Sequence, residues 1–590
     1  MKRTLCLSSV FALSALVLGC GFESEPEPAA GGEVRFISGS AIKTLDPQVT
    51  SWLVDFRIIE GLFEPLLRVN PETLELEPSA AAALPKVSDD GLIYTFTIRE
   101  DARWSNGDPL LASDFAYGWM RALLPDLAAD YAALFFTIEG AEDFYSWRTQ
   151  RLADFQNLGI SADEFWAQTR QRFADTVGIE PIDDRTLRVT LAQPTAYFNE
   201  LVAFAPFSPV HEATADAYLE AEATAGGLNM DPVYFQRPDL LVSNGPYLLK
   251  QWRFKQQLVL DQNPYWWNRA EMGNTRVVMQ VVTDPTAALL RYNRGEADWY
   301  PGLPTGSRDA AKLVQSDRPD VHYGPAAGTY FYVFNCRPTV DGQANPFADP
   351  RVRRAFSMAV DRQTLVDNVT QLGQPVAKTF VPPAAIPGYD APVDAGVSFD
   401  PEAARQLLAD AGYPSGQGLS GLTLLINEGG GHEDPAQFIR KAWETHLGVS
   451  VQIESVERIT FSDRLKTGGF QVARAGWFGD YRDPTTFHDK FRSNNNNNDG
   501  LYQNPAYDRL LERAEAELDP AARMALLAEA EALMLAEQPL MPLYHYTNLE
   551  LFDPGRVTGL HPNPWNIRRL DAITVRPAPG SSLGNAPNSE

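Results

Sequence analysis

The segment RAGWFGDYRDP, residues 474–484, brings a base, an aromatic run and an acid close together. Asp480 can accept charge-assisted hydrogen bonds from an ammonium group, and Arg474 can donate a pair of them to a carboxylate. The residues between them can form an extended run whose backbone pairs with another strand. That run contains Gly476, Trp477 and Phe478. An acid, a strand edge and a base together match the constant parts of a peptide: its ammonium, its backbone and its carboxylate.

Common enzyme motifs are missing from the sequence. It contains no HExxH, GxSxG, CxxC or Walker motif, and its seven histidines are too scattered to ligate one metal from a helical turn. One GxGxxG match, at Gly416, Gly418 and Gly421, precedes an expected strand, the reverse of the order that dinucleotide binding requires. We therefore expect no enzyme, no metal and no cofactor. One enzymatic alternative stays open, a secreted glycoside hydrolase that uses Asp480 and Asp483 as paired carboxylates.

The N-terminus, MKRTLCLSSVFALSALVLGC, has the pattern of a bacterial export signal. Two cations precede an uncharged run that is short for a membrane span, so residues 1–19 are predicted to be a signal peptide. The Val-Leu-Gly stretch before Cys20 resembles a lipobox, in which the cysteine is lipidated and becomes the first residue. An ordinary signal peptide with a chance cysteine is the alternative, because Leu18 is larger than the residue usual there. Residues 20–32 are acidic and rich in Pro and Gly, which predicts a disordered tether.

Composition and charge limit the class of protein. The chain has 590 residues, 44% of them hydrophobic and 21% charged, which suits a globular body of two or three domains. Its formal net charge of −26 argues against nucleic acid as a partner, because phosphate binding needs clustered Lys and Arg. Cys6 belongs to the signal and Cys20 takes the lipid, so Cys336 remains alone and no internal disulfide is expected. We expect Cys336 to be apolar filler.

The elements that must position residues 474–484 alternate between strand and helix patterns. Runs rich in β-branched and aromatic residues predict strands at 33–38, 92–99, 186–191, 257–261, 329–335, 422–427 and 449–454. Helix-like runs begin at Ser113, Asp349, Asp400 and Ala521. The mixture predicts an α/β architecture without an internal repeat. Residues 576–590 are rich in Pro, Asn and Ser, which is typical of a disordered tail.

Several segments, in their order along the chain, resemble those of one known family. They are TLDPQ (44–48), EGLFEPL (60–66), ARWSNGDPLLASDFAYGWMR (102–121), SNGPYLL (243–249), DPRVRRAFSMAVDR (349–362), ARAGWFGDYRDPTTF (473–487) and PLYHYTN (542–548). They resemble the oligopeptide-binding proteins of peptide ABC importers, which are bacterial solute-binding proteins of family 5 and of the cluster C periplasmic-binding type. The resemblance implies a monomer in the periplasm, held on a bacterial membrane by its lipid, that passes oligopeptides to the importer's permease subunits.

The resemblance also assigns roles to single residues. In the family, the Asp matched by Asp480 anchors the amino terminus of the peptide, and the Arg matched by Arg474 helps to hold the carboxylate of some peptides. His432 matches a histidine that reaches the peptide C-terminus, although a solvated loop histidine is the open alternative. The other matches are a segment that pairs with the peptide backbone and a tyrosine that faces the ligand: Ser51, Trp52, Leu53 and Tyr131.

The fold class that follows is α/β, a two-lobed periplasmic-binding-protein type II fold with an extra inserted domain. We expect domain I, in lobe 1, to combine residues 33–62, 204–327 and 549–575, domain II to be the insertion 63–203, and domain III, or lobe 2, to be residues 328–548. The lobes would close over a ligand by hinge motion. Within the same fold the alternative ligands are a dipeptide, a nickel chelate, haem, an opine or an oligosaccharide.

Overall fold

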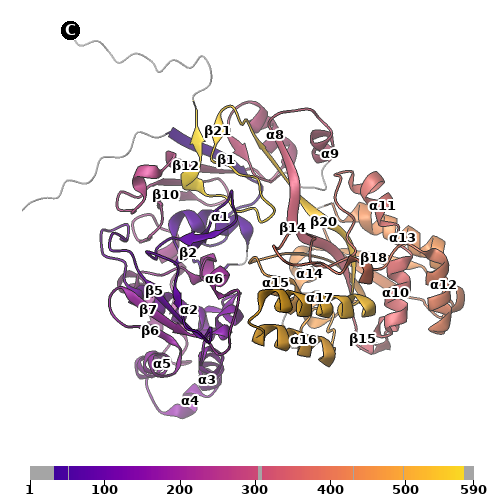
Figure 1. Cartoon of the computed structure of the whole chain (residues 1–590), viewed down its shortest axis with the longest axis horizontal. Coiled ribbons are helices and arrows are strands. Elements are labelled where there is room, and N and C mark those ends of the chain that lie inside the picture. The colour runs from indigo at the N-terminus through magenta and orange to yellow at the C-terminus, as the bar shows by residue number, and fades with distance from the viewer. Residues whose placement is uncertain are drawn as a thin grey trace, which may run out of the picture.

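The computed structural model describes residues 32–576, except residues 51, 303–307, 384, 429–430, 494 and 496. Two bodies are visible in Figure 1. One is formed by the indigo to magenta part of the chain, with the yellow strand β21 (Val557–Thr558) beside it, and the other mainly by the orange to gold part. As names we keep the division predicted above: lobe 1 (residues 33–62, 204–327 and 549–575), the inserted segment (63–203) and lobe 2 (328–548). The predictions for residues 1–31 and 577–590 lie outside the described residues.

A ten-stranded sheet runs through both bodies, in the order β10-β11-β12-β1-β13-β20-β14-β19-β17-β18. Each strand predicted for this sheet is present. The limits agree within two residues, except that β14 (Val321–Phe334) begins eight residues before the predicted start at residue 329. The strands are β10 Tyr247–Arg253, β11 Gln257–Gln262, β12 Asn274–Val281, β1 Gly32–Ser38, β13 Trp299–Tyr300, β20 Leu540–Phe552, β14 Val321–Phe334, β19 Val472–Phe478, β17 Leu422–Asn427 and β18 Val451–Val456.

The chain crosses between the lobes in β14 and β20, which pair antiparallel along most of their length. The register of this pair shifts between Pro325 and Thr329, where the chain passes from lobe 1 to lobe 2. At this point a Cβ on Gly328 would lie 2.6 Å from the ring of Phe478, so only a glycine lets β14 run this close to β19. An interrupted ladder at the crossing is a suitable place for the backbone rotations of a hinge.

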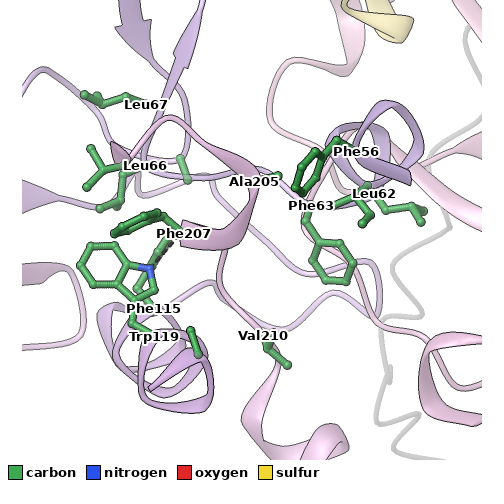
Figure 2. Close-up of a cluster of buried hydrophobic side chains, with 14 of the residues drawn as sticks. Phe56, Leu62, Phe63, Leu66, Leu67, Phe115, Trp119, Ala205, Phe207 and Val210 are labelled. Carbon is green, nitrogen blue, oxygen red and sulfur yellow. Dashed lines mark hydrogen bonds between the residues drawn. The ribbon is translucent and has the colours of Figure 1, made fainter. Parts of the chain in front are cut away.

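The inserted segment has a small sheet of its own but shares its core with lobe 1. Figure 2 shows Phe56 and Leu62 of lobe 1 in the same buried cluster as Phe115 and Trp119 of the inserted segment. The indole of Trp119 also donates to the carbonyl of Phe207 at 2.7 Å. Because one large buried apolar cluster contains residues of both, we treat the inserted segment and lobe 1 as one body. The elements are β2 Leu67–Val69, β3 Leu76–Pro78, β4 Lys86–Val87, β5 Ile93–Thr97, β6 Ile179–Pro181, β7 Thr186–Thr190, α2 Ala112–Ala122, α3 Ala141–Ala153, α4 Phe155–Leu158, α5 Ala162–Thr176 and α6 Phe198–Leu201.

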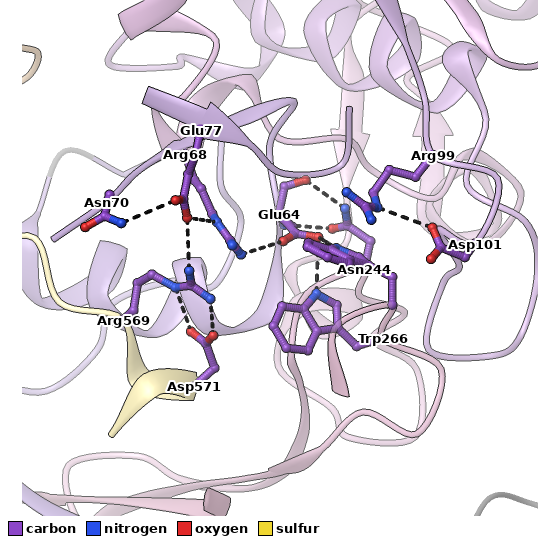
Figure 3. Close-up of polar contacts among 11 residues, drawn as sticks. Glu64, Arg68, Asn70, Glu77, Arg99, Asp101, Asn244, Trp266, Arg569 and Asp571 are labelled. Carbon is purple, nitrogen blue, oxygen red and sulfur yellow. Dashed lines mark hydrogen bonds and ion pairs between the residues drawn. The ribbon is translucent and has the colours of Figure 1, made fainter. Parts of the chain in front are cut away.

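A polar network also joins the inserted segment to the C-terminal part of lobe 1 (Figure 3). Arg68 donates to Glu77 at 2.7 Å, and the guanidinium of Arg569 lies 3.3 Å from the same carboxylate. Arg569 pairs in addition with Asp571. These contacts tie the returning C-terminal segment to the insertion, so the two parts have little freedom to move separately.

Helices cover the sheet in both lobes. Two of the predicted starts agree with the structure, because Asp349 and Asp400 each cap a helix with a side-chain oxygen. The helix predicted from Ala521 begins one residue earlier, at Pro520, and Asp519 caps it. The helix predicted from Ser113 begins one residue earlier: α2 starts at Ala112, and Asp114, not Ser113, accepts the N–H of Leu111 at 2.8 Å. The helices are α1 Leu53–Leu62, α7 Glu212–Ala215, α8 Pro285–Asn293, α9 Arg308–Val314, α10 Pro350–Met358, α11 Arg362–Leu365, α12 Pro401–Asp410, α13 Glu433–Leu447, α14 Arg458–Thr467, α15 Thr485–His488, α16 Pro505–Ala516 and α17 Pro520–Glu537. In the described part of the chain, none of them has the length and apolar character that crossing a bilayer requires.

Candidate functional site

A cavity of about 1240 Å³ lies between the two bodies. It exceeds the range of about 300–1,000 Å³ that is usual for small-molecule sites, so it has room for an extended ligand. Its walls come from all three parts of the chain. The residues that matter below are Trp52, Leu53, Arg57, Glu60 and Asn566 of lobe 1, Tyr131 and Glu200 of the inserted segment, and Arg474, Gly476, Trp477, Phe478, Asp480, Arg482 and Lys490 of lobe 2.

Strand β19 presents a free edge to this cavity. Its whole length pairs with β14, from Val472 to Phe478, but its other edge pairs with β17 only at Val472 and Ala473. In the described residues, the edge from Arg474 onward therefore has no partner strand. A Cβ at Gly476 would lie 2.4 Å from the hydroxyl oxygen of Tyr546, so the strand needs a glycine here. The exposed edge is suited to pairing with an extended ligand.

Asp480 closes one end of this edge. The hydroxyl of Tyr131, across the cleft in the inserted segment, donates to its carboxylate at 2.8 Å. The backbone N–H of Asp480 donates to the hydroxyl of Thr486 at 2.9 Å, which fixes the turn. Burial raises the pKa of Asp480 to about 6, and the bond from Tyr131 offsets only part of that shift. In the described residues no Lys, Arg or His forms an ion pair with this carboxylate, so its charge is not neutralised by the protein.

Arg474 lies at the other end of the free edge. Its guanidinium donates to Nε2 of His432 at 2.6 Å, and Nδ1 of that ring lies 3.2 Å from the hydroxyl of Tyr330. Since arginine only donates, Nε2 must be unprotonated and His432 neutral. Burial, together with the charge of Arg474, lowers the pKa of His432 to about 3, which agrees with that assignment. Among the described residues Arg474 has no carboxylate partner. His432 itself does not line the cavity but lies behind Arg474.

The lobe 1 wall opposite β19 is partly apolar. Trp52 and Leu53 line the cavity and keep 37% and 52% of their surface exposed, so they can cover an extended ligand. Trp52 is extended, but Leu53 already begins α1, so the expected backbone-pairing segment is shorter than predicted. Ser51 lies outside the described residues. Of the predicted site residues, Tyr131, Trp477 and Phe478 also line the same cavity.

Most other charges around the cavity are paired. Lys490 and Asp499 are 3.0 Å apart, and Arg482 forms a bidentate pair with Glu200. Glu60 is an exception, since it has no hydrogen bond or ion pair within the described chain. Its side chain is exposed to the cavity, and desolvation by the surrounding cleft raises its pKa to about 7. The unneutralised groups of the cavity thus include Asp480 and Arg474.

The positions of Asp480 and Asp483 argue against the glycoside hydrolase alternative, in which the two side chains act as paired carboxylates. Asp483 is 4% exposed and is held in a buried bidentate pair with Arg523, at 2.6 and 2.9 Å. It does not line the cavity, so Asp480 and Asp483 cannot act on one sugar from opposite sides. Among the described residues no group of three His, Cys, Asp or Glu side chains is arranged to hold a metal ion.

The sequence analysis gave no role to four residues that line the cavity: Glu60, Glu200, Asn566 and Arg482. Glu200 pairs with Arg482 from 282 positions away, so only the folded topology reveals the contact. Arg482 lies inside the segment 474–484, where its charge was visible but its partner was not.

The chain matches a known protein family. Residues 75–499 match the family described as bacterial extracellular solute-binding proteins, family 5. The chain belongs to this family. It is 31% identical to the oligopeptide-binding protein OppA of Bacillus subtilis over 93% of this chain and 95% of that protein. The family resemblance stated from the sequence is therefore confirmed.

Solved structures of family 5 proteins share the fold. The murein tripeptide-binding protein MppA of Escherichia coli superimposes with a TM-score of 0.76, at 29% identity over 93% of this chain and 99% of that chain. OppA of Haemophilus influenzae, in complex with the peptide RPPGFSPFR, gives a TM-score of 0.74, at 26% identity over 93% of this chain and 100% of that chain. The predicted multi-domain α/β fold of the periplasmic-binding type is thereby confirmed.

Proposed function

We propose that this protein captures short peptides in the cavity between its lobes and delivers them to the membrane subunits of an ABC importer. One observation carries the proposal: an unneutralised carboxylate and an unneutralised guanidinium lie at the two ends of an unpaired strand edge. A free peptide is the common ligand with the complementary set, a cation, a strand edge and an anion. The relatives named for oligopeptides support the same ligand class.

Each predicted residue then has a defined task. Asp480 receives the peptide ammonium, with Tyr131 as a second oxygen at the same end, and Arg474 receives the carboxylate. The edge of β19 near Gly476 pairs with the peptide backbone. Four strand rises, from Arg474 to Phe478, cover about 13 Å, which suits a peptide of a few residues. His432 contributes indirectly, because it holds Arg474 in place without competing for its charge.

Native mass spectrometry of the protein as purified tests this proposal. Co-purified peptides of mixed mass, released on denaturation, are the expected result. Calorimetry with tetra-alanine should then give saturable binding to the emptied protein. A protein that carries no peptide and binds none of several free tri- to pentapeptides would refute the proposal. A single non-peptide mass, such as a nickel chelate or an oligosaccharide, would favour another ligand of the same fold.

We also propose that Cys20 carries a lipid that holds the protein on a bacterial membrane, on the outer side of the inner membrane or on the outer membrane. The support is the sequence pattern of a cationic start, an apolar run and a Gly-Cys junction, followed by an acidic tether. Cys20→Ser should release the protein into the soluble fraction, while the wild type sediments with membranes. Cys6→Ser is the matched control and should change nothing. If Cys20→Ser stays in the membrane fraction, the lipid anchor is wrong.

A further inference from the structure

Glu200 and Arg482 form an ion pair across the cleft, between the inserted segment and lobe 2. Arg482 donates from Nη2 to one carboxylate oxygen of Glu200 at 2.5 Å and from Nε to the other at 3.0 Å. The two side chains are 10% and 16% exposed. A bidentate pair of this kind is directional, so it needs the two bodies at one particular separation.

The pair belongs to a row of contacts made by three consecutive residues of lobe 2. Asp480 accepts a hydrogen bond from Tyr131, Tyr481 stacks on Tyr197 with ring centroids 5.1 Å apart, and Arg482 pairs with Glu200. Each of the three partners lies in the inserted segment. The row therefore fastens the body of lobe 1 to the same turn that carries the proposed ammonium anchor.

Both members of the pair are held on rigid supports. Glu200 lies on α6, whose Phe198 and Leu201 are fully buried. Arg482 is followed by Asp483, which the guanidinium of Arg523 fixes from inside lobe 2. Neither side chain can follow the other if the lobes separate, so opening the cleft must break the ion pair.

We propose that Glu200 and Arg482 are a positioning pair, a latch that holds the inserted segment against lobe 2 and so keeps Tyr131 on Asp480 in the peptide-loaded state. This proposal rests on the proposed function. Both residues line the cavity, but each neutralises the other, so neither is needed for the charges of the ligand. The latch acts by shifting the open-to-closed equilibrium, which changes the apparent affinity in proportion to the closed fraction.

Charge reversal tests the latch in the full-length soluble protein that carries Cys20→Ser. Glu200→Arg and Arg482→Glu should each weaken the binding of tetra-alanine about 10-fold or more, because each leaves two like charges facing across the interface. The double variant E200R/R482E restores opposite charges and should bind within about threefold of the wild type. The milder Glu200→Gln, which keeps the shape, should lie between. High salt should reduce the difference between wild type and Glu200→Gln.

The matched control is Arg188→Glu, which reverses a charge in an ion pair with Glu180 inside the inserted segment's own sheet. It should leave the affinity unchanged, since it bridges no cleft. Thermal melting of each variant checks that it is folded. Tight tetra-alanine binding by both single reversals, or a double variant as weak as the two losses combined, would overturn the latch and leave the proposed function standing. A wild type that binds no peptide would refute the proposed function instead.

Discussion

The two ends of the cavity are built in different ways. At the ammonium end, Asp480 belongs to lobe 2 and its partner Tyr131 to the inserted segment, so the end is complete only when the bodies meet. At the carboxylate end, the contacts of Arg474 come from His432, Tyr330 and Phe461, all in lobe 2. We infer that the carboxylate of a peptide can bind to the open protein, whereas its ammonium group is bound fully only when the cleft closes.

Both ends nevertheless share one electrostatic rule. Each holds a charge against a neutral partner, a phenol for Asp480 and an unprotonated imidazole for Arg474. Glu200 and Arg482, in contrast, neutralise each other in an ion pair close to Asp480. A buried charge without a counter-ion is costly, and a ligand that supplies the counter-ion removes that cost. The cavity thus contains charges that are free to pair with a ligand and charges that are already paired within the protein.

The largest expected effect comes from removing the carboxylate at the ammonium end. Asp480→Ala leaves the peptide ammonium without a counter-ion in a closed cleft, a loss of about 3–5 kcal/mol or roughly two to four decades in affinity. Calorimetry with free-amino and N-acetylated versions of one peptide measures it. The acetylated peptide should be a poor ligand of the wild type and should lose little more in the variant.

Equal weakening of both peptides by Asp480→Ala would contradict this assignment. So would an N-acetylated peptide that binds the wild type as well as the free one. In either case Asp480 is a turn residue, and the comparison between the two ends loses its basis.

A smaller effect is expected at the carboxylate end. Arg474→Gln removes charge-assisted hydrogen bonds that the peptide carboxylate shares with lobe 2 alone, which should cost about 10- to 100-fold in affinity. C-terminally amidated peptides should bind the wild type more weakly and lose little further in the variant. Small-angle scattering should still show a smaller radius of gyration with saturating peptide, because closure depends on the other end. A variant that no longer closes would show that both ends sense closure.

These same residues show which features of the fold and the site could be predicted from the sequence. Strand β19 and its acid and base were readable, because the segment carries local signals of pattern and chemistry. The caps at Asp349 and Asp400 were readable for the same reason. The partnership of Glu200 with Arg482 was not, since two separate elements meet only through the topology of the whole chain. The contact of His432 with Arg474 was also hidden: the family match predicts only a place at the peptide C-terminus, and the structure adds that the ring accepts a hydrogen bond from Arg474.

The smallest expected effect is a pH dependence that belongs to one end only. Burial raises the pKa of Asp480 to about 6, while the pKa of His432 is lowered to about 3. An ammonium binds the ionised carboxylate, so binding must release the proton that Asp480 carries below its pKa. The affinity should therefore be constant above pH 7 until the peptide amine titrates, and should fall about tenfold between pH 7 and pH 5.

Calorimetry of one free-amino peptide at pH 7, 6 and 5 measures this slope. Neither His432 nor the peptide carboxylate changes its charge in that window, so the carboxylate end contributes nothing to the slope. Glu60 is the cavity group that complicates the reading, because its pKa is raised to about 7. Asp480→Asn separates the two: it should bind weakly at every pH and lose the tenfold fall. If Asp480→Asn keeps the slope of the wild type while Glu60→Gln abolishes it, then the proton is released from lobe 1, and the ammonium end does not carry the pH dependence assigned to it here.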